Sequence, residues 1–582
     1  MPESSVQQLL QHGLEHHRAG RLAEAERLYR EVLGIEPNNA DALHLLGLLA
    51  IHVGRPDMAI ELLSRAVAIR PEMAGFQWDL GKALAATGQW SAAMAAYERA
   101  IQLGPPVGEL WNDVGIAFQV NGQWANAAQA YEKGIAINPD LADLWNNLGS
   151  ARTELDEFAE AERCLRRAIE LRPEYPEAWN NLGNALQAMG KMQDSLMMYE
   201  TALKQRPDYA RVYNNMGRAL RALDRPEQAV AAFAKSIELN PRLPDGHNSL
   251  GTAMLDECRI DEAIASFRRA IELNPNLAEA HQNLGRVLLL SGDFENGWNE
   301  YEWRWGMKDV IKGYPRMNQP VWGGEPLEGR TILLHAEQGF GDTIQFVRYA
   351  PLVKSRGGRV VLAGQKQLKQ LLESCDGIDQ VVVEGEPLPP FEVRAPLLSL
   401  PRIFGTRMDS IPGGVPYLRV DEDRIARFQQ WAGTRPPLRV GLVWSGRPTY
   451  ADDRRRSMRF EVLAPLLEVP DFAFHSLQTG DAAGQVDTAR VKDWSGELHN
   501  FADTAALLMN LDLLITVDTA VAHLAGALGR RAWVLLPFSP DWRWMLDRED
   551  NPWYPTVRLF RQEGAGDWES VIHHVRRSMG EL

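Results

Sequence analysis

The chain has 582 residues, of which 45% are hydrophobic and 24% charged, and its formal net charge is −15 at pH 7. This length predicts three to four domain-sized units, and the acidic balance argues against a general nucleic-acid binder. The three cysteines form no Cys-x-x-Cys pair, no apolar run is long enough to cross a bilayer, and the N-terminus lacks a signal-peptide pattern. We therefore expect a soluble, cytoplasmic protein without a metal or other cofactor.

The first half of the sequence repeats with a period of 34 residues. Glycine recurs at nine positions from Gly13 to Gly285, and proline recurs at eight positions from Pro37 to Pro275. This period and these signatures are typical of the tetratricopeptide repeat, a helix–turn–helix unit. Because one repeat cannot bury its apolar face alone, about nine repeats covering residues 1–306 are predicted to stack into an α-helical superhelix with a groove.

A polar column lies two residues before the repeated glycines and includes Asn147, Asn181, Asn215 and Asn283. In tetratricopeptide proteins the first helix of each unit lines the groove, where amides can pair with the backbone of an extended peptide. The column resembles the asparagine ladder of eukaryotic O-linked N-acetylglucosamine transferase, which predicts a peptide-binding groove. The alternative is that these amides bond within the array and position neighbouring helices.

Beyond the repeats, residues 307–330 read as a linker with turn residues such as Pro315 and Pro320. Short apolar runs then alternate with helix-like segments, which indicates parallel, doubly wound sheets with ligands bound at the carboxyl ends of strands. The pattern restarts after a proline-rich stretch, so we predict two Rossmann-like lobes, at 331–430 and 431–582, with a cleft between them. The predicted strands are Thr331–Leu334, Arg359–Leu362, Val381–Val383, Arg439–Trp444, Phe472–Leu477, Leu513–Val517 and Ala532–Leu536, and the predicted helices are Ile344–Ser355, Lys366–Glu373, Glu461–Leu467, Asp503–Asn510 and Thr519–Leu528.

Three segments carry a more specific signal: HAEQGFGDTIQFVRYAPL (335–352), VGLVWSGRP (440–448) and DTAVAHLAGALG (518–529). They resemble the GT-B glycosyltransferases of the heptosyltransferase-like family 9, in particular bacterial proteins in which such a domain follows tetratricopeptide repeats. The resemblance covers essentially residues 1–575. It implies metal-independent, inverting transfer of a sugar from a nucleotide diphosphate to a hydroxyl, with an N-terminal acceptor lobe and a C-terminal donor lobe.

Without a metal, the leaving diphosphate needs another positive environment. Asp518, Thr519 and Ala520 follow an apolar strand and open a helix, whose unpaired N–H groups and positive dipole end suit a diphosphate. Ala520 stands where heptosyltransferases commonly have glycine. One turn on, His523 either faces the nucleotide or the phosphate, or packs as a buried helix histidine. Three tryptophans follow the last predicted strand: Trp542, Trp544 and Trp553. Most of them are expected to be core, and the alternative is that one stacks on a base or a sugar.

The segment Arg447–Arg459 is locally basic in an acidic protein and follows the predicted strand Arg439–Trp444. Guanidinium forks suit phosphate oxygens, so Arg454 and Arg456, together with Ser457, are predicted to bind the donor. The alternative is a solvated charged loop, which is the usual place of a charge run.

Asp342 is the predicted catalytic base, because the resemblance places the aspartate of this Gly-Asp turn at the acceptor hydroxyl, whose proton a nearby carboxylate can take. In the alternative, Asp342 and Gln345 form a capping pattern for the following helix, and the two roles can coexist. The same turn supplies four further predicted contacts to the acceptor or the cleft: Glu337, Gln338, Gly339 and Gly341.

The predicted function is transfer of a sugar to a Ser or Thr hydroxyl of a polypeptide that the repeat groove recruits, because nine repeats exceed what a small acceptor needs. Some proteins of this layout glycosylate flagellin, which makes flagellin one candidate acceptor. Two alternatives are transfer to a lipid-linked or polysaccharide acceptor, and a catalytically inactive repeat scaffold. A nucleotide sugar and a partner protein are the expected ligands.

Overall fold

A computed structural model gives the fold and describes residues 2–307, 317–432, 438–448 and 453–582. The chain forms two compact units, Met1–Asn240 and Pro241–Leu582. Three predicted features fall partly outside the described residues: the linker, at 308–316 with Pro315; the start of the donor lobe, at 433–437; and the basic segment, at 449–452.

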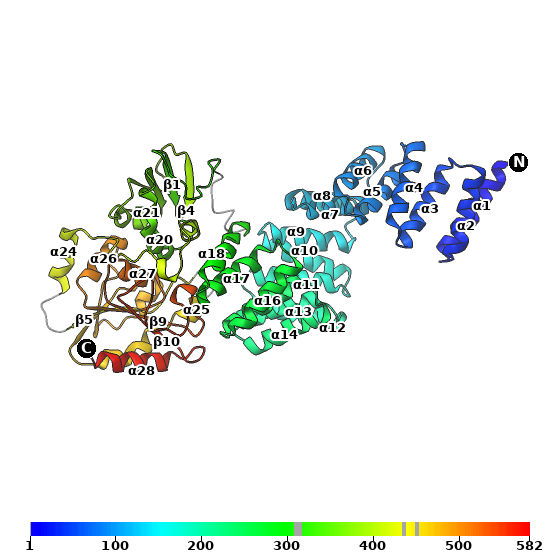
Figure 1. Cartoon of the computed structure of the whole chain (residues 1–582). Coiled ribbons are helices and arrows are strands. Elements are labelled where there is room, and N and C mark those ends of the chain that lie inside the picture. The colour runs from blue at the N-terminus through cyan, green and yellow to red at the C-terminus, as the bar shows by residue number, and fades with distance from the viewer. Residues whose placement is uncertain (1, 308–316, 433–437, 449–452) are drawn as a thin grey trace. The chain divides into compact units, whose positions relative to one another are not determined.

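The described residues of the first unit form seven antiparallel helix pairs, which Figure 1 shows from blue to green. The repeated glycines allow the two helices of a pair to approach closely. A Cβ atom on Gly115 would lie 2.2 Å from Cε1 of Tyr131, so only glycine fits beneath this aromatic ring. The predicted tetratricopeptide array is confirmed by this packing and by alanines such as Ala59 and Ala127, which are 0% exposed.

The helices of the first unit are α1 (Pro2–Arg18), α2 (Leu22–Ile35), α3 (Ala40–His52), α4 (Pro56–Ile69), α5 (Ala74–Ala86), α6 (Trp90–Leu103), α7 (Gly108–Val120), α8 (Trp124–Ile137), α9 (Ala142–Glu154), α10 (Phe158–Leu171), α11 (Pro176–Ala188), α12 (Met192–Gln205), α13 (Ala210–Ala222) and α14 (Pro226–Leu239).

Side-chain hydrogen bonds link each of several repeats to the next, always between residues 35 positions apart. The asparagines donate from their amide nitrogens across 2.9 Å to the amide oxygen of the preceding repeat. The predicted alternative, bonding within the array, is therefore confirmed, whereas peptide binding by these amides remains a prediction. The rungs are His44–Asp79, Trp78–Asp113, Asn147–Asn112, Asn181–Asn146 and Asn215–Asn180, and within the second unit Asn283–Asn248.

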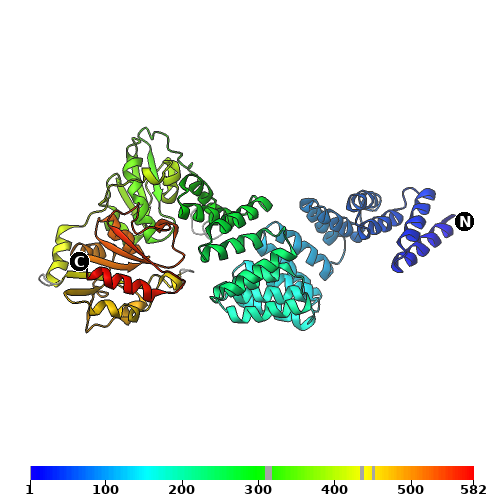
Figure 2. The ribbon, with the colours of Figure 1, turned by 60° about the horizontal axis from the view of Figure 1, so that its bottom comes forward.

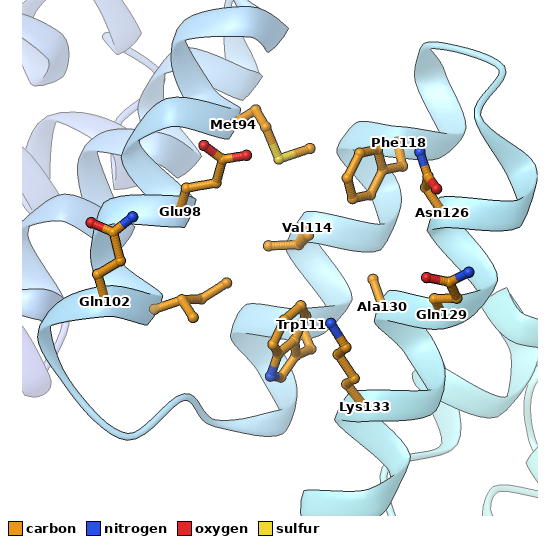
Figure 3. A pocket seen from close by; sticks show the side chains of 11 residues that line it. Met94, Glu98, Gln102, Trp111, Val114, Phe118, Asn126, Gln129, Ala130 and Lys133 are labelled. Carbon is orange, nitrogen blue, oxygen red and sulfur yellow. The ribbon is translucent and has the colours of Figure 1, made fainter.

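The stacking of repeats is looser between α6 and α7, although both helices contribute to one buried cluster. Gly104 ends α6 in an extended conformation (φ −156°, ψ 172°), whereas Glu36 and Asn138 bond back to the preceding helical turn at the equivalent ends. Two prolines follow Gly104 and cannot donate such bonds. A hollow of about 410 Å³ opens here between α6, α7 and α8. Figure 3 shows its lining, which includes Met94, Val114 and Phe118 with Trp111 below and the polar Glu98 and Lys133 beside them.

The second unit begins with two further helix pairs, α15 (Pro244–Asp256) with α16 (Ile260–Leu273) and α17 (Ala278–Ser291) with α18 (Phe294–Tyr301), followed by the 3₁₀ helix η1 (Glu302–Gly306). These last repeats share one hydrophobic core with the sheets that follow. Trp298 is 3% exposed, its indole N–H donates to the Thr406 carbonyl at 3.0 Å, and its ring meets the edge of Trp542. The boundary between compact units thus lies at 240 and 241 and not where the repeats end.

The first sheet has four parallel strands in the order β3-β2-β1-β4. From β1 the sheet is extended first on one side, by β2 and β3, and then on the other side, by β4, so the strand order reverses between β1 and β4. The predicted helix Ile344–Ser355 is wrong in its bounds, because the helical stretch starts at Phe340 and is broken before Pro351. The elements are β1 (Thr331–His335), α20 (Phe340–Phe346), η2 (Val347–Tyr349), α21 (Ala350–Lys354), β2 (Arg359–Gly364), η3 (Lys366–Leu368), α22 (Lys369–Leu372), β3 (Gln380–Val383), β4 (Val393–Pro396), η4 (Leu397–Ser399), α23 (Leu400–Ile403), η5 (Met408–Ser410) and α24 (Glu422–Ala432).

The second sheet has six parallel strands in the order β10-β9-β8-β5-β6-β7, which reverses between β5 and β8. Helix α28, red in Figure 2, covers one face and packs Val575 against the core that contains Trp533. The predicted helix Glu461–Leu467 is a 3₁₀ helix with Pro465 inside it. The elements are β5 (Leu438–Val443), α25 (Asp453–Arg456), η6 (Phe460–Glu468), β6 (Phe472–Ser476), η7 (Asp481–Gln485), β7 (Val491–Asp493), α26 (Phe501–Met509), β8 (Leu513–Val517), α27 (Ala520–Ala527), β9 (Ala532–Leu536), η8 (Trp542–Trp544), β10 (Val557–Arg561) and α28 (Trp568–Met579).

Candidate functional site

The candidate site lies where the strand order of each sheet reverses. In doubly wound sheets the two connections leave such a point in opposite directions, and ligands bind there at the carboxyl ends of the strands. In the first sheet, Glu337 to Asp342 follow β1 at this point. In the second sheet, Gly446 follows β5 and Asp518 follows β8. The segments predicted from sequence thus occupy the expected edges of both sheets.

Asp342 lies in the first turn of α20, and each of its carboxylate oxygens has a partner. Oδ2 accepts a hydrogen bond from the Gly339 backbone N–H at 2.9 Å, and Oδ1 forms an ion pair with Nη2 of Arg543. The helix is capped by Gly339, with Asp342 at its third position, so the predicted capping pattern of Asp342 and Gln345 is wrong in position. Burial raises the pKa of Asp342, and the positive charge of Arg543 opposes this shift.

Arg543 is the centre of the cluster. Its Nη1 donates to Oδ1 of Asp541 at 2.8 Å, its Nε donates to Oε1 of Gln345 at 2.9 Å, and its Nη2 pairs with Asp342. The guanidinium carbon lies 4.3 Å from the centre of the Trp542 ring. Although burial acts in the opposite direction, Asp541 and Asp342 hold the pKa of Arg543 above its usual value. This arginine therefore joins carboxylates from the two sheets.

Asp541 and Asp518 belong to the same electrostatic network. Burial is opposed at Asp541 by Arg543 and by Arg286 of α17, which hold its pKa below the usual value. Burial and the nearby charge of Asp541 raise the pKa of Asp518 to about 6, against the influence of Arg456. The carboxyl of Asp518 consequently changes charge close to neutral pH, at the start of α27.

Helix α27 starts one residue later than the predicted Thr519. Thr519 occupies the N-cap position and Ala520 is the first helical residue. The hydroxyl of Thr519 lies 3.1 Å from the hydroxyl of Thr516, and its side chain makes no capping hydrogen bond. The first backbone N–H groups of α27 thus have no side-chain cap from Thr519, as a diphosphate site at this helix end requires.

His523 is buried one turn into α27. Its Nδ1 lies 3.0 Å from the Tyr554 hydroxyl, and its ring stacks on Trp544 with 5.2 Å between centroids. Burial and the positive charge of Arg543 lower its pKa to about 3, so the imidazole is neutral at pH 7. A Cβ atom on Gly341 would lie 2.7 Å from Cδ2 of His523, which explains glycine at this close approach. These contacts match the packing alternative, and a nucleotide contact remains a prediction.

The described part of the basic segment is ordered around Asp453. Its Oδ1 accepts from Nε of Arg456 at 3.1 Å, and its Oδ2 accepts from the Ser457 hydroxyl at 3.0 Å. The Ser457 hydroxyl in turn accepts the Gly446 backbone N–H at 2.8 Å. Arg454 is exposed, whereas Arg456 is half-buried beside Gly446, so the geometry distinguishes the two predicted donor contacts.

Glu337 is a buried structural partner. Its side chain is 1% exposed, and both oxygens accept from Arg304 at 2.8 and 3.1 Å. One of these oxygens also accepts the Leu398 backbone N–H at 3.2 Å. Nothing in this geometry supports the predicted acceptor contact of Glu337. Gln338 and Gly339, by contrast, are exposed in the turn after β1.

Sequence reasoning missed Arg286, Asp541 and Arg543. The tryptophans around them are core as predicted, since Trp542, Trp544 and Trp553 are at most 2% exposed. Their position in the chain could have indicated two of them, because Asp541 and Arg543 follow strand β9 within a few residues. Charged residues between buried tryptophans after a parallel strand are candidates for a site.

Among the described residues, no group of three or more His, Cys, Asp or Glu side chains is arranged to hold a metal ion. Over the same residues, no helix is both long and apolar enough to span a membrane.

Comparisons with known proteins identify the repeats. The family described as the C-terminal domain of cilia and flagella-associated protein 70 matches residues 80–287, and the tetratricopeptide repeat family matches residues 16–67. Protein FlbA of Caulobacter vibrioides is 29% identical over 328 residues, which cover 51% of this chain and 54% of FlbA. The chain thus spans about half the length of this relative.

Solved structures are similar over the repeats. The Cut9–Hcn1 tetramer of the APC/C is 21% identical, with a TM-score of 0.38, and the match covers 48% of this chain and 55% of that one. A tetratricopeptide repeat protein from Parabacteroides merdae is 17% identical, with a TM-score of 0.37, and covers 43% and 99%. MamA is 29% identical, with a TM-score of 0.27, and covers 28% and 95%. The chain thus contains a tetratricopeptide repeat array, followed by a C-terminal region of parallel sheets.

Proposed function

We propose that this chain is a metal-independent glycosyltransferase of the GT-B type. It moves a sugar from a nucleotide diphosphate to a Ser or Thr hydroxyl of a protein that the repeats recruit. The observation that carries this proposal is the cluster of Asp342, Arg543, Asp541, Asp518 and Arg456 at the strand ends of both sheets. Two sheets that share one polar cluster suit a reaction between two bound substrates.

In this proposal the donor diphosphate binds at the start of α27. The N–H groups of that helix and the Arg456 guanidinium stabilise the negative charge that grows on the leaving phosphate. Asp342 takes the proton of the acceptor hydroxyl as its oxygen attacks the anomeric carbon, and the bond to the diphosphate breaks in the same displacement. The raised pKa of Asp342 supports a base role, because a base works best when its pKa approaches the ambient pH.

The tetratricopeptide array supports a protein acceptor, because stacked repeats of this kind present extended surfaces to polypeptides. Asn147, Asn181, Asn215 and Asn283 each use one amide hydrogen in a rung, and every asparagine amide carries two. The second hydrogen is the proposed donor to a peptide carbonyl. Recruitment by the ladder thus does not require the rungs to break.

A non-enzymatic scaffold is the second candidate, and one observation favours it. Arg543 forms ion pairs with Asp342 and Asp541 and donates a hydrogen bond to Gln345, so the positive charge at the centre of the cluster is already neutralised. A site built only to hold two sheets together would have the same pairing. The two functions differ in whether a nucleotide binds.

Titration calorimetry with uridine, guanosine, thymidine and adenosine diphosphates distinguishes them. We expect the wild-type chain to bind one of these, and Arg456→Ala to weaken binding by about tenfold, which corresponds to about 1.4 kcal/mol. The matched control is Arg459→Ala, which removes an exposed arginine that forms an ion pair with the nearby Glu461. Failure of all four nucleotides to bind the wild-type chain would favour the scaffold.

A further inference from the structure

The end of helix α15 contacts the segments that carry the candidate donor site. Asp256 is the last residue of α15, and its carboxylate faces the guanidinium of Arg455 in a forked arrangement. Nη2 of Arg455 donates to Oδ2 of Asp256 at 2.9 Å, and Nη1 pairs with Oδ1. The Asp256 side chain is 15% exposed and that of Arg455 is 25% exposed, so solvent screens this pair only partly.

The same turn holds a second segment. The Leu255 carbonyl accepts the Ser539 hydroxyl at 2.9 Å, and the thiol of Cys258 donates to the Phe538 carbonyl at 3.0 Å. Phe538 and Ser539 lie three and two residues before Asp541, the partner of Arg543. The eighth repeat therefore contacts both the α25 segment and the segment that leads to the central arginine.

We propose that Asp256 is a positioning residue for the nucleotide, and that the eighth repeat thereby controls donor binding from outside the sheets. Asp256 fixes Arg455 in α25. The neighbouring residue Arg456 is thereby held beside Gly446, with Asp453 and Ser457 completing the arrangement. This inference rests on the proposed function for its donor, whereas the ordering of α25 by Asp256 stands independently.

The inference has a physical basis in the shortness of α25. Its four residues, Asp453–Arg456, are too few to form a stable helix by themselves, so tertiary contacts must hold them. Asp453 supplies contacts from within the segment, and Asp256 supplies a charged contact from a rigid helix. Removing the Asp256 charge leaves Arg455 without this carboxylate fork and allows the segment to open locally.

Hydrogen exchange of the full-length chain without any ligand tests the ordering step. We expect Asp256→Asn to reduce the protection of amides in residues 453–460 by about tenfold while the melting temperature stays close to that of the wild type. Asp261→Asn is the matched control, because Asp261 is an exposed acid five residues further on in the first turn of α16. Arg455→Gln should reproduce the Asp256→Asn change, and the double variant should add nothing to it.

Nucleotide binding by the same variants tests the donor step. With the diphosphate that binds the wild-type chain, we expect Asp256→Asn and Arg455→Gln each to weaken binding by about tenfold, and Asp261→Asn to bind normally. Unchanged exchange at 453–460 in Asp256→Asn would overturn the positioning role, whichever nucleotide binds. Faster exchange in Asp256→Asn with unaltered nucleotide affinity would overturn the control of donor binding. If Asp256→Asn exchanges faster but the wild-type chain binds none of the four nucleotides, the proposed donor itself would be overturned, while the ordering of α25 by Asp256 would stand.

Discussion

Asp342 and Arg543 form an ion pair between the turn after β1 and the segment after β9, 201 residues apart in the chain. The pair joins the two sheets at the edges where doubly wound folds bind ligands. Arg543 extends the link to Asp541, whose charge also raises the pKa of Asp518. Replacing any of these side chains therefore changes the electrostatic environment of charged residues on both sheets.

Replacing Arg543 should destabilise the second unit strongly. Arg543→Met removes the cation that Asp342 and Asp541 share and leaves two largely buried carboxylates without it, which costs up to about 3 to 5 kcal/mol of unfolding free energy. Urea unfolding followed by tryptophan fluorescence measures this cost. Arg548→Met is the matched control, because it breaks an exposed pair with Asp550 and should cost less than about 1 kcal/mol. Equal stability of the two variants would contradict the central role of Arg543.

Asp518 should make stability depend on pH. Its pKa is raised to about 6, so the folded chain holds this proton between about pH 4 and pH 6 while the unfolded chain releases it. The contribution of Asp518 to stability consequently falls as the pH rises through this window. Asp518→Asn removes that contribution, so the variant should gain on the order of 2 kcal/mol relative to the wild type between pH 4 and pH 7. A constant difference between the two chains across this range would show that Asp518 titrates normally.

Two glycine substitutions in the first unit should have opposite signs. Gly115→Ala places a Cβ atom 2.2 Å from the Tyr131 ring, and such overpacking costs about 1 to 3 kcal/mol. Gly34 is exposed in α2 with nothing within 4 Å of an added Cβ, so Gly34→Ala should stabilise the chain by about 0.5 to 1 kcal/mol. Thermal unfolding followed by circular dichroism measures both. Tolerance of alanine at 115 would show that the repeat glycines are not required by packing.

Truncations should show that the last two repeats belong with the sheets. A chain that begins at Pro241 retains the Trp298, Arg304 and Asp256 contacts and should unfold cooperatively. A chain that begins at residue 307 lacks these contacts and leaves Glu337 buried without Arg304, so it should fail to fold. Gel filtration and near-ultraviolet circular dichroism distinguish the outcomes. A well-folded chain from residue 307 would place the structural boundary at the end of the repeats.

The repeat array could be predicted almost completely, because its period of 34 residues fixes the pairing of Gly115 with Tyr131 and of equivalent residues along the chain. The strands of continuous apolar residues, such as Leu513–Val517, were also predicted correctly. Three strands were missed: Val393–Pro396, Val491–Asp493 and Val557–Arg561. All three contain charged residues or proline, and neighbouring strands rather than local sequence determine their conformation.

The candidate site could be predicted only in part. Strand ends and glycine turns identified Asp342 and Asp518, because local sequence marks a strand that stops at a helix start. Partners such as Arg543 for Asp342 and Arg304 for Glu337 come from distant segments, and nothing in the local sequence pairs them. The sequence therefore indicates candidate groups for a site, whereas the ion pairs that bury or orient them depend on the tertiary fold.

Intact-mass spectrometry of proteins that co-purify with this chain from its native cells tests the proposed function most directly. The comparison is between cells with the wild-type chain and cells whose only copy carries Asp342→Asn. The account predicts a partner protein that carries a sugar-sized mass with the wild-type chain and lacks it with the variant, because the proposed base is removed. A partner that keeps the sugar mass in the variant cells would contradict the role of Asp342, and partners without any such mass in either strain would contradict protein glycosylation.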